Sequence, residues 1–142
     1  MSSPRVVLDT NVLVAAIRSR RGASYRLLDQ VGRGRFEIVL SVALVLEYEE
    51  ILEQHRAAAG LNESDIQDLL DYLCEVGTHQ TVFYLWRPAL PDPDDDMILE
   101  VAVAGGCEGI VTFNARDFWG AERFGLWIET PRDFLKRIGV IS

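Results

Sequence analysis

Short apolar runs rich in β-branched residues alternate along this chain with longer segments whose apolar side chains recur at helical spacing. Such alternation is typical of a parallel sheet whose strands are joined by helices. We therefore expect one α/β domain over residues 1–142. The expected strands are 6–8, 36–40, 81–85, 109–112 and 126–128. The expected helices are 12–17, 23–31, 42–58, 64–76, 93–104 and 131–137, and residues 113–123 are expected to form a loop.

Hydropathy and cysteine usage predict a protein that neither crosses a membrane nor leaves the cytoplasm. With 49% hydrophobic residues the chain can bury a real core, yet no stretch approaches the ~20 apolar residues of a membrane span. Residues 1–5 lead directly into the first strand and do not resemble a signal peptide. Cys74 and Cys107 form no CxxC pair, so we expect reduced, mostly buried thiols in a cytoplasmic protein.

Charge is distributed unevenly along the chain. The net charge of −8 argues against a protein that coats nucleic acids in general. Residues 1–35, however, hold seven arginines and only two acidic residues, Asp9 and Asp29. Such a local excess of positive charge indicates a basic surface on an otherwise acidic protein. Two interpretations of Arg18, Arg20 and Arg21 stay open. They contact phosphates, or they form an ordinary solvated surface.

Asp9 ends the first apolar run and is followed by Thr10 and Asn11. An acid at the carboxyl end of the first parallel strand lies where open α/β sheets bind ligands and metals. The simpler interpretation is that Asp9 or Thr10 caps the next helix. Taken alone, the pattern favours the cap, so a chemical role depends on whether other acids reach the same place.

Four carboxylates occur within five residues, at positions 92 and 94–96. Ordinary helix-start chemistry accounts for Asp92 and Asp94 but does not need all four. At about 100° per residue, Asp95 falls on the apolar stripe of its helix, whereas Asp96 and Glu100 fall to one side. Because an unpaired buried charge is costly, Asp95 should meet a partner or a metal. The stripe consists of Ile98, Leu99 and Ala102.

Glu47 is the acid that a solvated helix flank explains least. The apolar face of its helix centres on Leu44, Tyr48, Ile51 and Leu52, and Glu47 lies about 40° from Ile51. A third group, Thr112, Asn114 and Asp117, follows the end of a buried strand, as Asp9 does.

The carboxyl ends of parallel strands share one edge of a sheet, so these oxygen donors should meet there. Oxygen ligands suit Mg²⁺ or Mn²⁺ and suit zinc poorly. His55 and His79 offer no paired ligand spacing.

Together these motifs resemble the PIN-domain family of metal-dependent nucleases, in particular the toxins of bacterial toxin–antitoxin systems (VapC-like ribonucleases). The resemblance implies a three-layer α/β/α fold with a central, mainly parallel sheet. It is carried, in order, by residues 8–12, by Glu47-Tyr48 with Leu46 and Ile51, by residues 92–95 before Leu99 and Ala102, by residues 110–114 with Asp117-Phe118, and by the ending 129–135.

The resemblance also implies the roles of individual residues. Asp9, Glu47 and Asp95 match the family's catalytic acids, which bind Mg²⁺ or Mn²⁺. A fourth family acid usually stands two residues after the strand-ending Thr; this chain has Asn114 there, and Asp117 is the candidate substitute ligand. The residues expected to support these ligands or contact substrate are Thr10, Asn11, Asp92, Thr112 and Asn114.

The implied activity is hydrolysis of phosphodiester bonds in single-stranded RNA. The implied partners are an antitoxin and a second copy of the chain in a homodimer, with Trp86, Trp119 and Trp127 as usable interface aromatics. Two alternatives compete with this activity. A phosphatase-type fold needs a second acid where this chain has Asn11, which disfavours it. A non-catalytic PIN-like module that binds RNA or protein, with a metal site weakened by Asn114, stays open.

Overall fold

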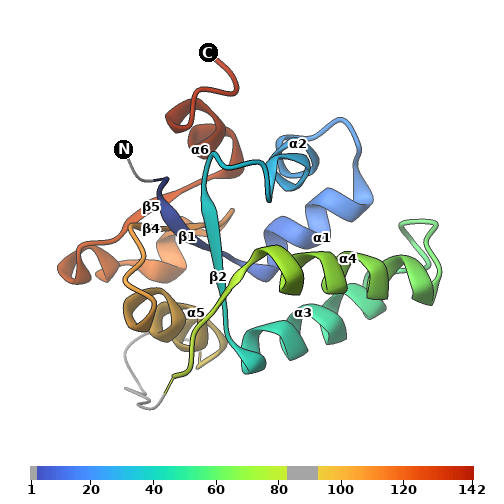
Figure 1. Cartoon of the computed structure of the whole chain (residues 1–142), viewed down its shortest axis with the longest axis horizontal. Helices are drawn as coiled ribbons and strands as arrows, with labels where there is room; N and C mark the ends of the chain where they lie inside the picture. The colour runs from blue at the N-terminus through green and yellow to red at the C-terminus, as the bar shows by residue number, and fades with distance from the viewer. Residues whose placement is uncertain (1–2, 83–92) are drawn as a thin grey trace.

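The computed structural model describes residues 3–82 and 93–142, although not the side chains of residues 93 and 94. Within these ranges the chain forms a five-stranded sheet in the order β3-β2-β1-β4-β5, and every neighbouring pair is parallel (Figure 1). The expected α/β fold with a central parallel sheet is therefore confirmed. The strands are β1 (Arg5–Leu8), β2 (Glu37–Leu40), β3 (Thr78–His79), β4 (Gly109–Val111) and β5 (Trp127–Glu129).

Helices cover both faces of the sheet. Four of them, α1 to α4, lie on one face, and α5 lies on the other, where it contacts β1, β2 and β4 (Figure 1). The last helix packs against α2. The helices are α1 (Thr10–Arg18), α2 (Ala23–Gln30), α3 (Val42–His55), α4 (Glu63–Val76), α5 (Pro93–Ala104) and α6 (Pro131–Arg137).

The helix starts show why these segments begin where they do. The Ser41 side chain caps α3 by accepting a hydrogen bond from the Leu44 backbone N–H at 3.1 Å. Asn62 and Asp65 form a reciprocal capping box at α4. Within the described residues no helix combines the length and the apolar character needed to cross a membrane.

The third strand is not where the sequence predicted it. The sequence predicts a strand at residues 81–85, but β3 is Thr78–His79. Thr81 and Val82 are not in a strand, and residues 83–85 lie outside the described part. The strand starts directly after Gly77 because that glycine lets α4 end tightly against β2. A Cβ on Gly77 would lie 2.8 Å from Leu40 Cδ1 and from the Leu73 carbonyl oxygen.

The segment after β4 is also more ordered than the predicted loop. Two short 3₁₀-helices occupy it, η1 (Ala115–Phe118) and η2 (Ala121–Phe124). Gly120 and Gly125 flank η2 with positive φ angles of 93° and 78°, which permits these tight turns. Phe118 and Ala121 are fully buried, so the segment is anchored and holds the residues just before it in place.

Candidate active site

A cavity of about 330 Å³ lies at the carboxyl edge of β1 and β4. Its wall brings together the acids that the sequence singled out from four separate segments: the end of β1, helix α3, the first turn of α5 and the segment after β4. We refer to it as the acidic cavity. Its lining residues are Asp9, Thr10, Asn11, Val14, Glu47, Ile51, His55, Asp95, Ile98, Asn114 and Asp117.

Asp9 occupies the N-cap position of α1, as the simpler interpretation expects, but its side chain makes no cap hydrogen bond, so capping does not account for its carboxylate. Instead its Oδ2 accepts a hydrogen bond from Thr112 Oγ1 at 2.7 Å. Asp9 is only 8% exposed. Burial raises the pKa of Asp9 above 3.8, and the Asp117 charge adds to this, against the lowering effect of Thr112 and the nearby Thr10 and Asn11 N–H groups.

Thr112 is fully buried and connects the ends of β1 and β4. Besides donating to Asp9, its hydroxyl accepts hydrogen bonds from the Asn114 backbone N–H at 3.0 Å and from Asn11 Nδ2 at 3.4 Å. Asn11 Oδ1 in turn accepts from the Phe113 N–H at 3.5 Å. These bonds fix the orientation of the Asp9 carboxylate toward the acidic cavity.

Glu47 reaches the same edge from α3. Its Oε2 accepts a 2.6 Å hydrogen bond from Thr10 Oγ1, on the residue that follows Asp9. The next residue, Tyr48, is buried and donates its hydroxyl to the Leu8 carbonyl oxygen at 2.5 Å. Burial, together with the charges of Asp9 and Glu47, raises the pKa of Tyr48 well above its usual value. The tyrosine is therefore uncharged, and its hydrogen bond to Leu8 holds α3 against β1.

Asp95 lines the acidic cavity from the first turn of α5, next to Ile98. The helical wheel placed Asp96 and Glu100 at the side of the buried stripe, but they are only 1% and 3% exposed, whereas Asp95 is half-buried. The reason is that α5 packs against three strands and α3, which buries a wide arc of the helix. Neither Asp96 nor Glu100 lines the acidic cavity; Glu100 lines another cavity beside His79.

Asn114 and Asp117 complete the wall. Asn114 is exposed, and its carbonyl oxygen accepts a 3.0 Å hydrogen bond from the Asp117 N–H, which closes the first turn of η1. This turn brings the half-buried Asp117 close enough to raise the pKa of Asp9 as a further contribution after burial. Asp92, which the sequence also singled out, lies outside the described residues.

Comparison with known proteins adds to this geometry. The family model described as PIN domain matches residues 5–116, which is most of the chain. The chain belongs to the PIN-domain family. The resemblance seen in the motifs is therefore confirmed.

A solved structure supports the same fold. A chain in the crystal structure of VapBC2 from Rickettsia felis, bound to a DNA fragment from their promoter, superimposes on this PIN domain with a TM-score of 0.60. It is 17% identical in sequence, and the match covers 87% of this chain and 98% of that chain. No curated protein matched the sequence.

Sequence reasoning missed His55 in this PIN domain. It lines the acidic cavity, and its Nδ1 lies 3.2 Å from Arg18 Nη1. Because a guanidinium only donates hydrogen bonds, Nδ1 is the acceptor and Nε2 carries the ring proton. A signal was present in the sequence: Ile51 and His55 follow Glu47 at intervals of four residues on α3, which places them on neighbouring parts of one helix face.

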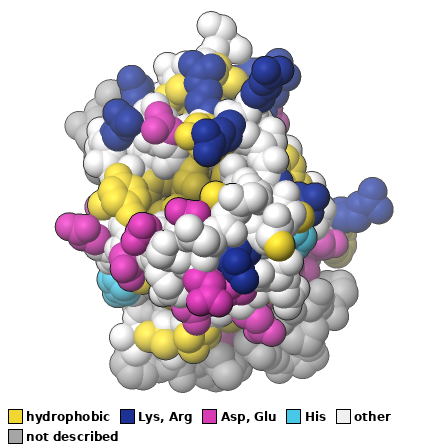
Figure 2. Space-filling model, turned by 90° about the vertical axis from the view of Figure 1, so that its right-hand side faces the viewer, with side chains coloured by type: hydrophobic (Ala, Val, Ile, Leu, Met, Phe, Trp, Pro, Cys, Tyr) yellow, Lys and Arg dark blue, Asp and Glu magenta, His cyan; other side chains and the backbone are white. Residues whose placement is uncertain are grey.

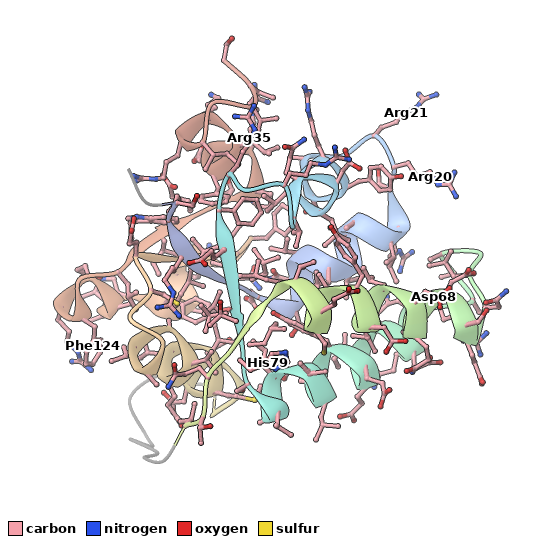
Figure 3. All side chains as sticks on the ribbon, viewed as in Figure 1. Arg20, Arg21, Arg35, Asp68, His79 and Phe124 are labelled. Carbon is pink, nitrogen blue, oxygen red and sulfur yellow. The ribbon has the colours of Figure 1, made fainter. Side chains whose placement is uncertain are left out.

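The structure divides the arginine cluster that the sequence treated as one. Arg18 reaches His55 at the acidic cavity. Arg20 and Arg21 extend from the loop between α1 and α2 (Figure 3) and line a different cleft. They belong to a separate surface.

The donor set of the acidic cavity fits a hard cation. Carboxylates from Asp9, Glu47, Asp95 and Asp117 and the amide oxygen of Asn114 are the ligand types that Mg²⁺ and Mn²⁺ prefer. Among the side chains described, no three His, Cys, Asp or Glu residues already form a compact metal-binding group. The fit therefore rests on the chemistry and the common cavity of these residues.

Proposed function

We propose that this PIN domain is a Mg²⁺- or Mn²⁺-dependent endoribonuclease that hydrolyses phosphodiester bonds in single-stranded RNA. The observation that carries the proposal is the acidic cavity, where Asp9, Glu47, Asp95 and Asp117 arrive from four segments far apart in the sequence. Gathering like charges in one cavity is unfavourable for folding, and a divalent cation would offset that cost.

In this proposal Asp9, Glu47 and Asp95 hold the cation, and Asp117 supplies the acid that Asn114 does not. When bound, such a cation would supply an activated water and neutralise charge on the phosphodiester oxygens. The remaining residues act by orientation. Thr112 holds Asp9 at 2.7 Å, Thr10 holds Glu47 at 2.6 Å, and Asn11 holds Thr112. Such supporting hydrogen bonds typically fix the direction of metal-ligand side chains.

His55 and Arg18 would place the RNA at the rim of the acidic cavity. Their 3.2 Å hydrogen bond leaves the His55 Nε2 proton free to donate to a phosphate or base oxygen. The Arg18 guanidinium, held at His55, adds positive charge beside a cavity whose wall carries four carboxylates. Asn114, which is exposed after the end of β4, would hold a water or a substrate oxygen.

We further propose that the protein is a cytoplasmic toxin that pairs with an antitoxin and forms a homodimer. The similar fold of a chain in a VapBC2 complex supports an antitoxin partner. Trp119 is 84% exposed, which suits a residue that a partner covers. Trp127, by contrast, stacks on Phe134 and lies under Arg137, so it serves the fold, and Trp86 lies outside the described residues. The free, half-buried thiols of Cys74 and Cys107 suit a reducing compartment.

One alternative keeps support from a specific observation. Asn114 stands at the usual position of a family acid, and the described acids are not already gathered at metal-ligand distances. A PIN-like module that binds RNA or protein without cleaving it would show both features.

Cleavage of a labelled single-stranded RNA decides between the two functions. We expect wild type to cleave with Mg²⁺ or Mn²⁺ and to stop in excess EDTA, and we expect Asp95→Asn to lose at least two orders of magnitude in rate. Asp68→Asn is the matched control, because Asp68 is an exposed acid on α4 outside the acidic cavity (Figure 3). Cleavage by Asp95→Asn at the wild-type rate, or no metal-dependent cleavage by wild type, would favour the binding module.

A further inference from the structure

Among the described residues, a second cleft, of about 430 Å³, shares no lining residue with the acidic cavity. Arginines from three parts of the fold meet there: Arg20 and Arg21 from the loop between α1 and α2, Arg26 from α2, and Arg132 from α6. We name it the arginine cleft. Figure 2 shows the basic side chains gathered mainly on the upper part of one face, with most of the acidic ones below them.

The charges in the arginine cleft are not balanced by the protein itself. Within the described part of the chain, none of these four guanidinium groups takes part in an ion pair or a side-chain hydrogen bond. Among the described residues the acid that lines the cleft is Asp29, and it pairs instead with Arg33, outside the cleft, at 3.3 Å from Arg33 Nη2. In a chain with 22 acidic and 14 basic residues, four unpaired arginines at one cleft indicate an anionic ligand.

The remaining wall is apolar and aromatic. Leu135 and Ile141 line the cleft, and Tyr25, which is 42% exposed, stands beside Arg26 in the sequence and in the wall. Guanidinium groups bind phosphates with paired hydrogen bonds, and an exposed aromatic ring offers a stacking surface for a base. An acidic peptide would use the charges but not the ring, so the composition of the wall favours a nucleotide chain.

We propose that the arginine cleft binds the phosphate backbone of single-stranded RNA away from the acidic cavity, with a base stacked on Tyr25. The inference rests on the proposed function for the identity of the substrate. Helix α1 starts at the acidic cavity and its nine residues span about 13 Å before the loop that carries Arg20 and Arg21. An RNA must therefore extend beyond the nucleotides at the acidic cavity to contact both places.

Binding of a fluorescent single-stranded RNA in EDTA, measured by anisotropy over a range of salt concentrations, tests the proposal. Each phosphate contact on a single strand contributes about 0.7 to the slope of log K against log salt. We expect Arg26→Gln and Arg132→Gln each to lower this slope by about that amount, and the double variant to weaken binding about tenfold or more at 0.1 M salt. Tyr25→Ala should weaken binding with no change in slope, and Tyr25→Leu likewise, because both remove the ring.

Arg123→Gln is the matched control, since Arg123 is an exposed arginine of η2 that lines neither cleft. It removes the same charge and should leave both affinity and slope unchanged. Unchanged RNA binding in the Arg26 and Arg132 variants would overturn the proposal. The proposal would also be overturned if these variants lost affinity for a poly-glutamate peptide but kept their affinity for RNA. That result would indicate a protein partner. The binding assay needs no metal and therefore does not depend on cleavage. If the arginine cleft binds RNA but wild type fails to cleave RNA in a separate assay with Mg²⁺ or Mn²⁺, only the proposed function is overturned.

Discussion

Thr112 Oγ1 donates a 2.7 Å hydrogen bond to Asp9 Oδ2 across a sequence separation of 103 residues. The bond joins the ends of the adjacent parallel strands β4 and β1. It also positions Asp9, which is the most buried of the acids described in the lining of the acidic cavity. In this PIN domain the sheet topology and the orientation of the proposed metal ligands are thus coupled through one hydroxyl.

Thr112→Val tests that coupling, because valine has nearly the same shape but no hydroxyl. The change leaves the buried Asp9 carboxylate without its hydrogen bond, so we expect the free energy of unfolding to fall by about 1–3 kcal/mol. We also expect Mn²⁺ affinity to fall by about 10- to 100-fold. Thr112→Ser keeps the hydroxyl and should retain most of the Mn²⁺ affinity in calorimetric titrations. Equal Mn²⁺ affinities for the valine and serine variants would contradict a role for the hydroxyl.

The raised pKa of Asp9 predicts how the stability of the metal-free protein depends on pH. The folded state favours the protonated form of Asp9. Its contribution to stability is therefore fully present below pH 3.8, the ordinary pKa of the group, and is lost as the pH rises through the higher pKa of the folded state. We therefore expect Asp9→Asn, measured in EDTA, to be more stable than wild type at pH 7. This advantage should shrink as the pH falls toward 4. Thermal melts in EDTA at several pH values measure this difference. If wild type were more stable than Asp9→Asn at pH 7, the raised pKa of Asp9 would be contradicted.

Asn114 and Asp117 should affect metal binding in opposite directions. With Asn114 neutral, we expect one tightly held divalent ion, and a second that is weak or arrives with an RNA phosphate. Asn114→Asp adds a carboxylate and should tighten Mn²⁺ binding, whereas Asp117→Asn removes one and should loosen it. Calorimetric Mn²⁺ titrations distinguish the variants. If neither differs from wild type, the strand end after β4 is not part of the metal site.

His55 should affect substrate binding more than chemistry. Replacing it with Phe removes the Nε2 donor and the bond to Arg18 while keeping a ring at the rim of the acidic cavity. We expect KM for RNA to rise several-fold, with a smaller change in kcat and unchanged Mn²⁺ affinity. His79→Phe is the control, because His79 lines a different cavity. A loss confined to kcat would contradict a placing role and would indicate proton transfer.

Much of this fold follows from local sequence patterns. The helix caps at Ser41 and Asn62 appear where a polar residue precedes an amphipathic segment. The position of Asp95 on the wheel of α5 also agrees with its place in the acidic cavity. In each case the determining residues lie close together in the chain, so their pattern can be predicted from the sequence.

The errors came from contacts between distant segments. Asp9 has the local pattern of a cap, but its actual partner is Thr112. The start of β3 depends on how closely Gly77 approaches Leu40, and the burial of Asp96 and Glu100 depends on how α5 packs on the sheet. His55 pairs with Arg18 because α1 packs against α3. No periodicity in the sequence encodes such pairings directly.

The central claim is that the acids of the acidic cavity bind a divalent ion, and anomalous scattering from crystals soaked in Mn²⁺ tests it most directly. We predict one strong peak in the acidic cavity at direct coordination distance, about 2 Å, from carboxylate oxygens of Asp9 and Asp95, with Glu47 bound directly or through a water. The peak should be absent from crystals of Asp95→Asn soaked in the same way. A peak elsewhere, or none at saturating Mn²⁺ in wild-type crystals with the acidic cavity open to solvent, would contradict the account.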